Sequence, residues 1–191
     1  SGYHDSDSTV IGFSHTHLSG TGIGDLFDIT VMPVTGDSVT FARGTEDDQQ
    51  SGLWSYADRT REVAKPGYYS VPLTRYGITA EMTATNRVGL HRYTFPASEN
   101  AAVVFDLQNG GCWDKATETF IEACGDKALR GYRYSRGWAR DQRIYFYLNT
   151  EFFSFNNSPE SIITYFVIDY YFSAIFECNV RPYAYIEIIG I

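Results

Sequence analysis

The chain has 191 residues, enough for one domain with a sizeable hydrophobic core and too few for two ordinary domains. Its formal net charge of -8 at pH 7 argues against nucleic acid as a partner, because nucleic-acid binders need clustered Lys and Arg to displace counterions. Aromatic residues make up 16% of the chain, with 15 Tyr and 13 Phe, and this excess favours an all-β fold in which rings pack on pleated sheets.

The first expected strands lie on either side of a glycine-rich turn. Residues 9–18 are predicted to form a strand, and residues 26–33 and 39–42 the next two. The first two are separated by the run Gly20-Thr21-Gly22-Ile23-Gly24, whose glycines allow a sharp turn and the close approach of another group. Residues 43–65 are charged and weakly periodic, so we expect a long excursion over the surface.

The later strands are predicted to follow one another closely. In residues 78–85 apolar and polar side chains alternate, as in a half-buried antiparallel strand, and residues 88–95 are the expected hairpin partner. Residues 162–176 are too short for a membrane span and are interpreted as a buried strand. The other expected strands are residues 68–73, 101–107, 117–123, 128–135 and 142–150. Many short strands predict a single antiparallel β-sandwich or barrel.

Three cysteines, Cys112, Cys124 and Cys178, form no CxxC pair, so the sequence supports neither a disulfide framework nor a thiolate zinc site. A Cys112–Cys124 bridge is compatible with the spacing and would indicate an oxidising compartment. The chain begins at Ser1 rather than Met, and we expect it to be part of a longer protein whose compartment this stretch does not indicate.

His15 and His17 are the most distinctive candidate site residues. Alternation along an extended strand would place both on the same face as Phe13, so that an apolar face becomes polar near the strand end. Imidazoles two residues apart can bind a transition metal, but a cupin-type iron site needs a Glu a few residues onward, and residues 19–22 contain none. Histidines that hydrogen-bond a sugar or a neighbouring domain are preferred, with a structural role as the alternative.

Other patterns point less clearly to a site. The glycine run lacks the following helix that a phosphate loop requires, because residues 26–33 are predicted to continue as a strand. Tyr132, Tyr134 and Trp138 are candidates for a sugar-stacking platform, although packing is the commoner use of such rings. Four aspartates could supply the paired carboxylates of a glycosidase, but their spacing singles out no pair. These are Asp5, Asp7, Asp25 and Asp28.

Several motifs occur together in one order. They are SGYH at residues 1–4, GFSHTHLSGTGIGD at 12–25, Asp28 with MP at 32–33, KPGYYSV at 65–71, YGITAEMTATNRVGLHRYTFP at 76–96 and GYRYSRGWARDQRIYF at 131–146. In length and order they resemble the N-terminal domain of glycoside hydrolase family 92, the calcium-dependent exo-acting α-mannosidases. The family pattern often carries Gly where this chain has Phe27, and the resemblance fades after residue 153. Residues 154–191 are therefore expected to be the divergent part of a single domain over residues 1–191.

The resemblance implies a β-supersandwich, the galactose-mutarotase-like carbohydrate-binding fold, packed on an (α/α)6 barrel. In such enzymes the barrel carries the general acid, the general base and most ligands of Ca2+, and the reaction inverts the anomeric centre of a terminal α-mannose in a mannose-containing glycan. It implies no catalytic residue, metal ligand or membrane contact in this chain. Bacterial family members are secreted, periplasmic or on the cell surface.

The leading hypothesis is therefore a domain that completes the substrate cleft of an α-mannosidase involved in N-glycan processing, inactive without the catalytic barrel. The predicted substrate-binding residues are Tyr3, His4, Ser14, His15, His17 and Asp25. Two rivals are a free-standing lectin-like carbohydrate-binding module and a metal-dependent β-barrel enzyme that uses His15 and His17.

Overall fold

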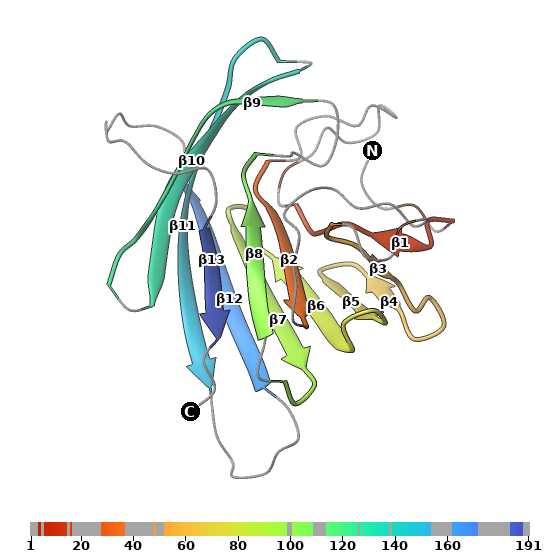
Figure 1. Ribbon diagram of the computed structural model, residues 1–191. Helices are drawn as coiled ribbons and strands as arrows, with labels where there is room; N and C mark the ends of the chain where they lie inside the picture. Colours follow the sequence, from red (N-terminus) through yellow and green to blue (C-terminus); the bar gives the residue numbers. More distant parts are fainter. Residues whose placement is uncertain are drawn as a thin grey trace.

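The computed structural model describes residues 4, 6–14, 16, 28–36, 48, 52–98, 101–108, 114–125, 127–137, 139–153, 162–171 and 184–188. Every regular element in these ranges is a β-strand, and the strands form two larger antiparallel sheets and one short pair (Figure 1). Within the described residues, no helix is long and apolar enough to cross a membrane.

The largest sheet has eight strands, each antiparallel to its neighbours. In spatial order these are β4 (Val63–Lys65), β5 (Tyr68–Leu73), β6 (Ile78–Ala84), β7 (Val88–Phe95), β12 (Ile162–Tyr171), β11 (Gln142–Phe153), β10 (Ala128–Arg136) and β9 (Lys115–Ala123). The sheet has β4 at one edge and β9 at the other, so these strands do not close into a barrel.

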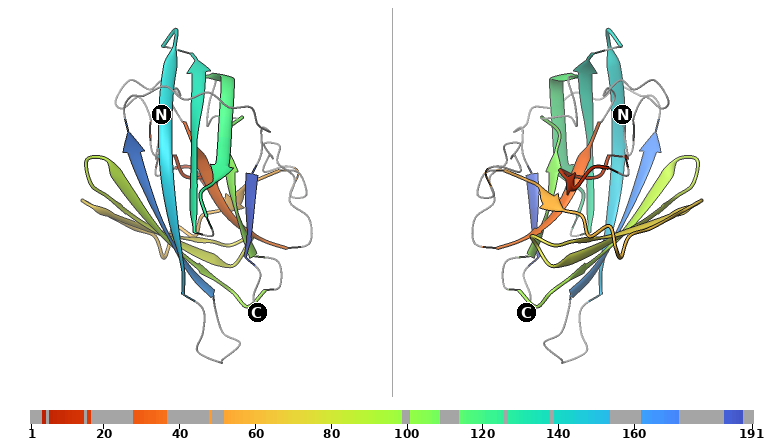
Figure 2. Two further views of the ribbon diagram at one scale, coloured as in Figure 1. Left: turned by 90° about the vertical axis from the view of Figure 1, so that its left-hand side faces the viewer. Right: turned by 90° about the vertical axis from the view of Figure 1, so that its right-hand side faces the viewer.

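The second sheet has three strands, β13 (Ala184–Ile188), β8 (Ala101–Asp106) and β2 (Thr30–Thr35), with β8 in the centre. It lies across the concave side of the eight-stranded sheet, which Figures 1 and 2 show from three directions. The short pair, β1 (Thr9–Val10) with β3 (Ser55–Tyr56), lies beside β4 and β5 (Figure 1). The architecture is therefore an antiparallel β-sandwich, as the sequence predicted.

Side-chain alternation explains the core between the two sheets. Along β7, Gly89, His91, Tyr93 and Phe95 are buried, while Leu90 and Arg92 on the opposite face are exposed. The strands β2 and β8 are buried along nearly their whole length and contribute apolar side chains from both sides of their sheet. A continuous cluster of buried residues joins these strands to β5, β6, β7, β9 and β11.

Most strands lie where the sequence predicted them, but the N-terminal ones differ. The first strand ends at Val10 rather than at residue 18. Gly12 has a φ of +146°, and among the described residues that follow, up to Thr16, only Phe13 pairs again, in an isolated bridge to Val31. The next strand starts at Thr30, later than predicted, after Ile29 with a φ of +57°. The predicted surface excursion contains β3 and β4, and the predicted strand at residues 39–42 lies outside the described residues.

The predicted strand at residues 162–176 is observed as β12, which ends at Tyr171. It lies in the middle of the large sheet and pairs with both β7 and β11. A strand from the far end of the sequence therefore joins the N-terminal half of the sheet to β11, β10 and β9.

Candidate functional site

The candidate site is built on the two chain segments that flank residues 17–27. Phe13 and Val31 exchange backbone hydrogen bonds of 2.8 Å and 2.9 Å. Next to this bridge, the Ser14 hydroxyl donates to the carbonyl of Asp28 at 2.9 Å, and the backbone N–H of Asp28 donates to the Thr16 hydroxyl at 3.1 Å. We call Ser14, Thr16 and Asp28 the loop base, because the chain leaves it at Thr16 and returns to it at Asp28.

Gly12 is needed for the approach of these two segments. A Cβ atom at this position would lie 2.4 Å from Cγ2 of Thr30 and 3.2 Å from the carbonyl oxygen of Val31. The φ of Gly12 is +146°, a backbone conformation that residues with a side chain rarely adopt. Both the conformation and the lack of space therefore require glycine here. The glycine therefore lets the N-terminal segment lie directly against the start of β2.

Asp28 belongs to a fully buried ion cluster. Its carboxylate pairs with the guanidinium of Arg133 on β10, and Nη1 of the same guanidinium lies 2.6 Å from the carboxylate of Asp114. The side chains of Asp28 and Arg133 are 0% exposed and that of Asp114 is 1% exposed. The Ser135 hydroxyl donates to Asp28 at 3.2 Å, and the Gln142 amide on β11 donates to the other carboxylate oxygen. The ion cluster thus connects the loop base to the large sheet.

This environment excludes Asp28 as a general acid or base. A catalytic carboxyl must reach the substrate or a water, whereas the Asp28 carboxylate has no exposed surface and already accepts hydrogen bonds from Arg133, Ser135 and Gln142. Asp28 is therefore not one of a pair of glycosidase carboxylates. Its role is to hold together three segments that are far apart in the sequence.

The backbone next to the ion cluster is strained. Ile29 is completely buried and has a φ of +57°, in the left-handed region that β-branched residues rarely adopt. Such a conformation costs of the order of 1–3 kcal/mol and persists only where the surrounding contacts determine it, as they often do at functional sites. The hydrogen bonds of Asp28 on one side and the Phe13–Val31 bridge on the other supply these contacts.

A cleft of about 470 Å³ opens next to the loop base. Ser14 lines it on one side, while Tyr69, Met82 and His91, which are cross-strand neighbours on β5, β6 and β7, lie on its sheet side. The other residues that line it come from the adjoining strand ends and hairpins; they are residues 64, 65, 67, 68 and 83–89. The cleft is therefore walled by a mixture of apolar, aromatic and polar side chains at the hairpin end of these three strands.

Aromatic contacts fix the sheet side of the cleft. Nδ1 of His91 lies 2.6 Å from the hydroxyl of Tyr93, and the ring of Phe13 packs against both residues. Burial raises the pKa of Tyr93 well above its ordinary value, and burial together with the Glu62 carboxylate raises that of Tyr69. Both tyrosines therefore stay neutral and act as hydrogen-bonding groups at neutral pH.

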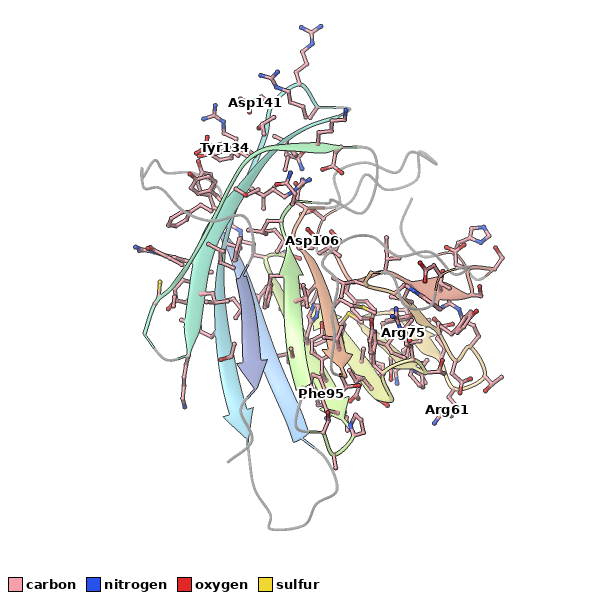
Figure 3. All side chains as sticks on the ribbon, in the orientation of Figure 1. Arg61, Arg75, Phe95, Asp106, Tyr134 and Asp141 are labelled. Atoms are coloured by element: carbon pink, nitrogen blue, oxygen red, sulfur yellow. The ribbon has the colours of Figure 1, made fainter. Side chains whose placement is uncertain are left out.

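Tyr132 and Tyr134, two of the candidates for a sugar-stacking platform, belong to a row of stacked rings, the tyrosine ladder, on the outward face of β9–β11 (Figure 3). Tyr132 stacks on Phe120 and on Tyr134 at centroid distances of 5.4 Å and 4.6 Å, and the guanidinium of Arg143 lies 4.9 Å from the centre of the Tyr134 ring. The hydroxyl groups of Tyr134 and Tyr145 are 2.7 Å apart. Because the rings cover one another's faces, this ladder packs the sheet surface and offers no open face of Tyr132 to a sugar.

The remaining predicted site residues have different outcomes. Ser14 lies in the loop base and lines the cleft. His4 is exposed, and its Nδ1 lies 2.8 Å from the Ser6 hydroxyl. The other candidates lie outside the described residues; they are Tyr3, Asp5, His15, His17, Asp25 and Trp138.

The described residues contain no group of three or more His, Cys, Asp or Glu side chains that could hold a metal ion. Cys124 has a free, half-buried thiol, and Cys112 lies outside the described residues.

Sequence reasoning missed Arg133, Asp114 and Gln142. A signal for Arg133 was present, because Tyr132 and Tyr134 alternate with Arg133 and Ser135 along the strand. The sequence analysis considered the aromatic residues of this strand and preferred a packing role for them, but it did not consider the polar face, which the structure buries. An arginine on the inward face of a strand predicts a buried acidic partner, here Asp28.

Comparison with known proteins agrees with this architecture. A profile of the glycosyl hydrolase family 92 N-terminal domain matches residues 1–162. The GH92 α-mannosidase BT3965 of Bacteroides thetaiotaomicron superposes with a TM-score of 0.75 at 30% identity, covering 91% of this chain and 25% of that one. The inverting GH92 mannosidase BT2199 of the same bacterium gives a TM-score of 0.59 at 22% identity over 90% of this chain and 23% of that one, which is a similarity of fold.

A curated relative, an uncharacterized secreted glycosidase of Arthroderma benhamiae, is 33% identical over 99 residues, which are 50% of this chain and 12% of the relative. The fold and the matching motifs define the class as an antiparallel β-sandwich domain of a glycoside hydrolase. The chain belongs to glycosyl hydrolase family 92, as its N-terminal domain. It spans 25% of the length of the solved relative BT3965, so the catalytic domain is not part of these 191 residues.

Proposed function

We propose that this domain completes the substrate cleft of an exo-acting α-mannosidase that removes terminal α-mannose from glycans, including N-glycans, with inversion and with calcium. The observation that carries the proposal is the loop base. Its side chains hold both ends of the segment that includes His17 and Asp25, and Ser14 extends from it into the lining of the cleft. Of the relatives that match in structure, BT3965 is named as an α-mannosidase and BT2199 as an inverting mannosidase.

In this proposal, the domain's own residues bind and orient substrate, while the reacting carboxyls come from the further domain. The described residues supply hydroxyl and imidazole groups around the cleft, which suit the hydroxyl groups of a sugar. They supply no exposed pair of carboxylates on the cleft wall, since its lining contains no Asp or Glu. The domain is therefore a substrate-binding half-site that is inactive alone.

The described residues do not fit a calcium ion. Calcium takes six to eight oxygen ligands, whereas the described residues contain no group of three or more His, Cys, Asp or Glu side chains that could hold a metal ion, and the buried carboxylates of Asp28 and Asp114 both face the guanidinium of Arg133. We therefore propose that the calcium ligands belong to the further domain, an (α/α)6 barrel in the resemblance stated above, and assign this chain no step that involves the ion.

The test measures mannose release from an α-mannoside by three samples: the 191-residue chain, the barrel domain of a GH92 relative, and the two together. Each sample is assayed with calcium and with a chelator. We expect activity only in the mixture and only with calcium. Release of mannose by the chain alone would contradict the proposal. Full activity of the barrel alone would show that this domain is not needed to complete the substrate cleft.

A free-standing lectin-like module makes a different prediction, namely binding of mannose by the isolated chain without a barrel. Calorimetric titration of methyl α-mannoside against the chain distinguishes the two functions. We expect no binding at millimolar sugar, because the proposed substrate site is complete only with the further domain.

A further inference from the structure

Two cationic residues line the cleft from neighbouring hairpin turns. Lys65 ends β4 at the turn to β5, and Arg87 lies in the turn between β6 and β7. The two turns are at the same end of the sheet, because Tyr69 near the start of β5 pairs with Met82 near the end of β6. Both cationic residues are exposed, so the cleft carries a positive charge on each of two adjacent turns.

Local contacts hold both residues near the cleft. Nζ of Lys65 lies 5.2 Å from the centre of the Tyr68 ring, and Tyr68 is itself a lining residue. In the other turn, the Thr85 hydroxyl accepts hydrogen bonds from the backbone N–H groups of Arg87, at 3.5 Å, and Val88, at 3.2 Å. These bonds fix the hairpin that carries Arg87.

No carboxylate of the described residues cancels these charges. Neither Lys65 nor Arg87 forms an ion pair with a described Asp or Glu, and the residues that line the cleft include no acid. The chain as a whole has a net charge of -8, so a cleft lined by cations and no acids differs from the rest of the molecule. The cleft is therefore a place where a negative charge would be attracted.

The acids that contact the cleft tyrosines are already neutralised. The Tyr68 hydroxyl donates to Glu81 at 2.7 Å, and the Tyr69 hydroxyl donates to Glu62 at 2.6 Å. Each of these carboxylates is also paired with an arginine that does not line the cleft. Lys65 and Arg87 therefore keep their charge for a ligand.

The size and chemistry of the cleft suit a small anionic ligand. Its volume of about 470 Å³ lies in the range of small-molecule sites. Lysine and arginine bind phosphate and carboxylate through charge-assisted hydrogen bonds, which are stronger than neutral ones. The hydroxyl of Ser14 and the imidazole of His91 in the same lining can hydrogen-bond sugar hydroxyls.

We propose that the cleft binds an anionic group of a glycan, a phosphate or a carboxylate, through Lys65 and Arg87. The sugar part of this ligand rests on the proposed function. The inference adds the charge class of the substrate: glycans that carry a negative group bind to this domain more tightly than neutral ones.

The test variants are Lys65→Gln and Arg87→Gln, which remove one charge each, with Arg87→Lys as the variant that restores it. The matched controls are Lys127→Gln and Arg140→Gln. Lys127 and Arg140 are exposed residues in the turns that precede and follow β10, and neither lines the cleft. The controls change the net charge of the protein by the same amount, so they separate a local site from a general effect of charge.

The first measurement is an NMR titration of the 191-residue chain at constant ionic strength. The probes are mannose 6-phosphate, mannuronate, inorganic phosphate and neutral mannose. We expect an anionic sugar to shift the amide signals of Gly67 and Gly89 with a millimolar Kd, and mannose to shift neither. Lys65→Gln and Arg87→Gln should each weaken this binding about tenfold, while Arg87→Lys and both controls stay within about twofold of the wild type.

The probes also identify the anion. Tighter binding of mannose 6-phosphate assigns a phosphate, and tighter binding of mannuronate assigns a carboxylate. If no anionic sugar binds, or if the cleft variants and the controls have equal Kd values, the inference is overturned. Inorganic phosphate that binds as tightly as mannose 6-phosphate would overturn it too, because the ion would then be bound without its sugar.

The second measurement uses the chain assembled with a barrel domain and asks whether the further domain occupies the cations instead. We expect mannose 6-phosphate or mannuronate to inhibit mannose release about tenfold more strongly than mannose does. If the anionic sugars do not inhibit, and Lys65→Gln and Arg87→Gln weaken assembly, the two residues pair with the further domain and the inference is overturned. An assembled wild type that releases no mannose overturns the proposed function, whereas the titration of the chain alone still decides whether the cleft binds an anion.

Discussion

Removal of Arg133 should destabilise the domain more than any other single loss of a surface or buried charge described here. Arg133→Met replaces the guanidinium with an apolar side chain of similar length and leaves the carboxylates of Asp28 and Asp114, which are 0% and 1% exposed, without their shared cation. Breaking a buried ion pair in this way costs about 3–5 kcal/mol. That is a large fraction of the 5–15 kcal/mol that stabilises an ordinary domain.

The assay is urea unfolding of the 191-residue chain followed by tryptophan fluorescence. With a slope of about 2 kcal/mol per molar urea, the expected loss lowers the midpoint by about 1.5–2.5 M. Arg130→Met is the matched control, because Arg130 is on the same strand and pairs with Glu122 on the surface, with side chains that are 62% and 35% exposed. Its midpoint should stay close to that of the wild type.

A second variant tests the same reasoning from the acidic side. Asp28→Asn leaves Arg133 paired with Asp114 and should be less destabilising than Arg133→Met, because it leaves no buried charge without a partner, whereas Arg133→Met leaves two carboxylates without their cation. The reasoning is refuted if Arg133→Met and Arg130→Met have the same midpoint, or if Asp28→Asn is the more destabilising of the two buried changes.

Two further predictions concern packing and pH. Gly131→Ala should destabilise the domain by about 1–3 kcal/mol, measured by urea unfolding. The reason is that a Cβ would lie 2.1 Å from the carbonyl oxygen of Phe120 and 2.7 Å from the Phe146 ring. A gain in stability, as expected where a strand glycine has free space around it, would contradict this geometry. The pKa of Asp58 is lowered to about 2, first by the hydroxyl of Thr60 and then by Arg61. A lowered carboxyl pKa means that the folded state binds the proton less tightly than the unfolded state, so this contribution to stability is present above pH 4 and is lost as the pH falls towards 2. Thr60→Val should therefore flatten the fall in stability over this acidic range, and an unchanged pH profile would show that the hydroxyl has no such effect.

Local sequence patterns were sufficient to predict the bounds of the regular strands. The strands β5 and β7 begin and end at the predicted residues, because alternation and flanking turn residues mark a half-buried antiparallel strand without reference to its neighbours. The long N-terminal strand was predicted wrongly for the same reason. Alternation in residues 9–18 is continuous, whereas the backbone turns at Gly12 so that the segment can dock against β2.

The candidate site could be predicted only in part. The motif around Ser14 and His15 was identified from its composition, and the structure places Ser14 at the cleft. The role of Asp28 was not predictable, because its partner Arg133 is more than a hundred residues away in the sequence, and no local pattern states which buried charges will meet.

By itself, the sequence determined the strand-rich class, most strand positions and the family, since these depend on composition, short-range alternation and contiguous motifs. Tertiary structure alone decided that β12 enters the middle of the large sheet, that the tyrosine ladder faces outward, and that Arg133 turns inward to Asp28. These features depend on which distant segments share a sheet and which face of each strand is covered. A strand's own residues allow either face, and the burial of charge is stable only where packing brings the opposite charge to the same place.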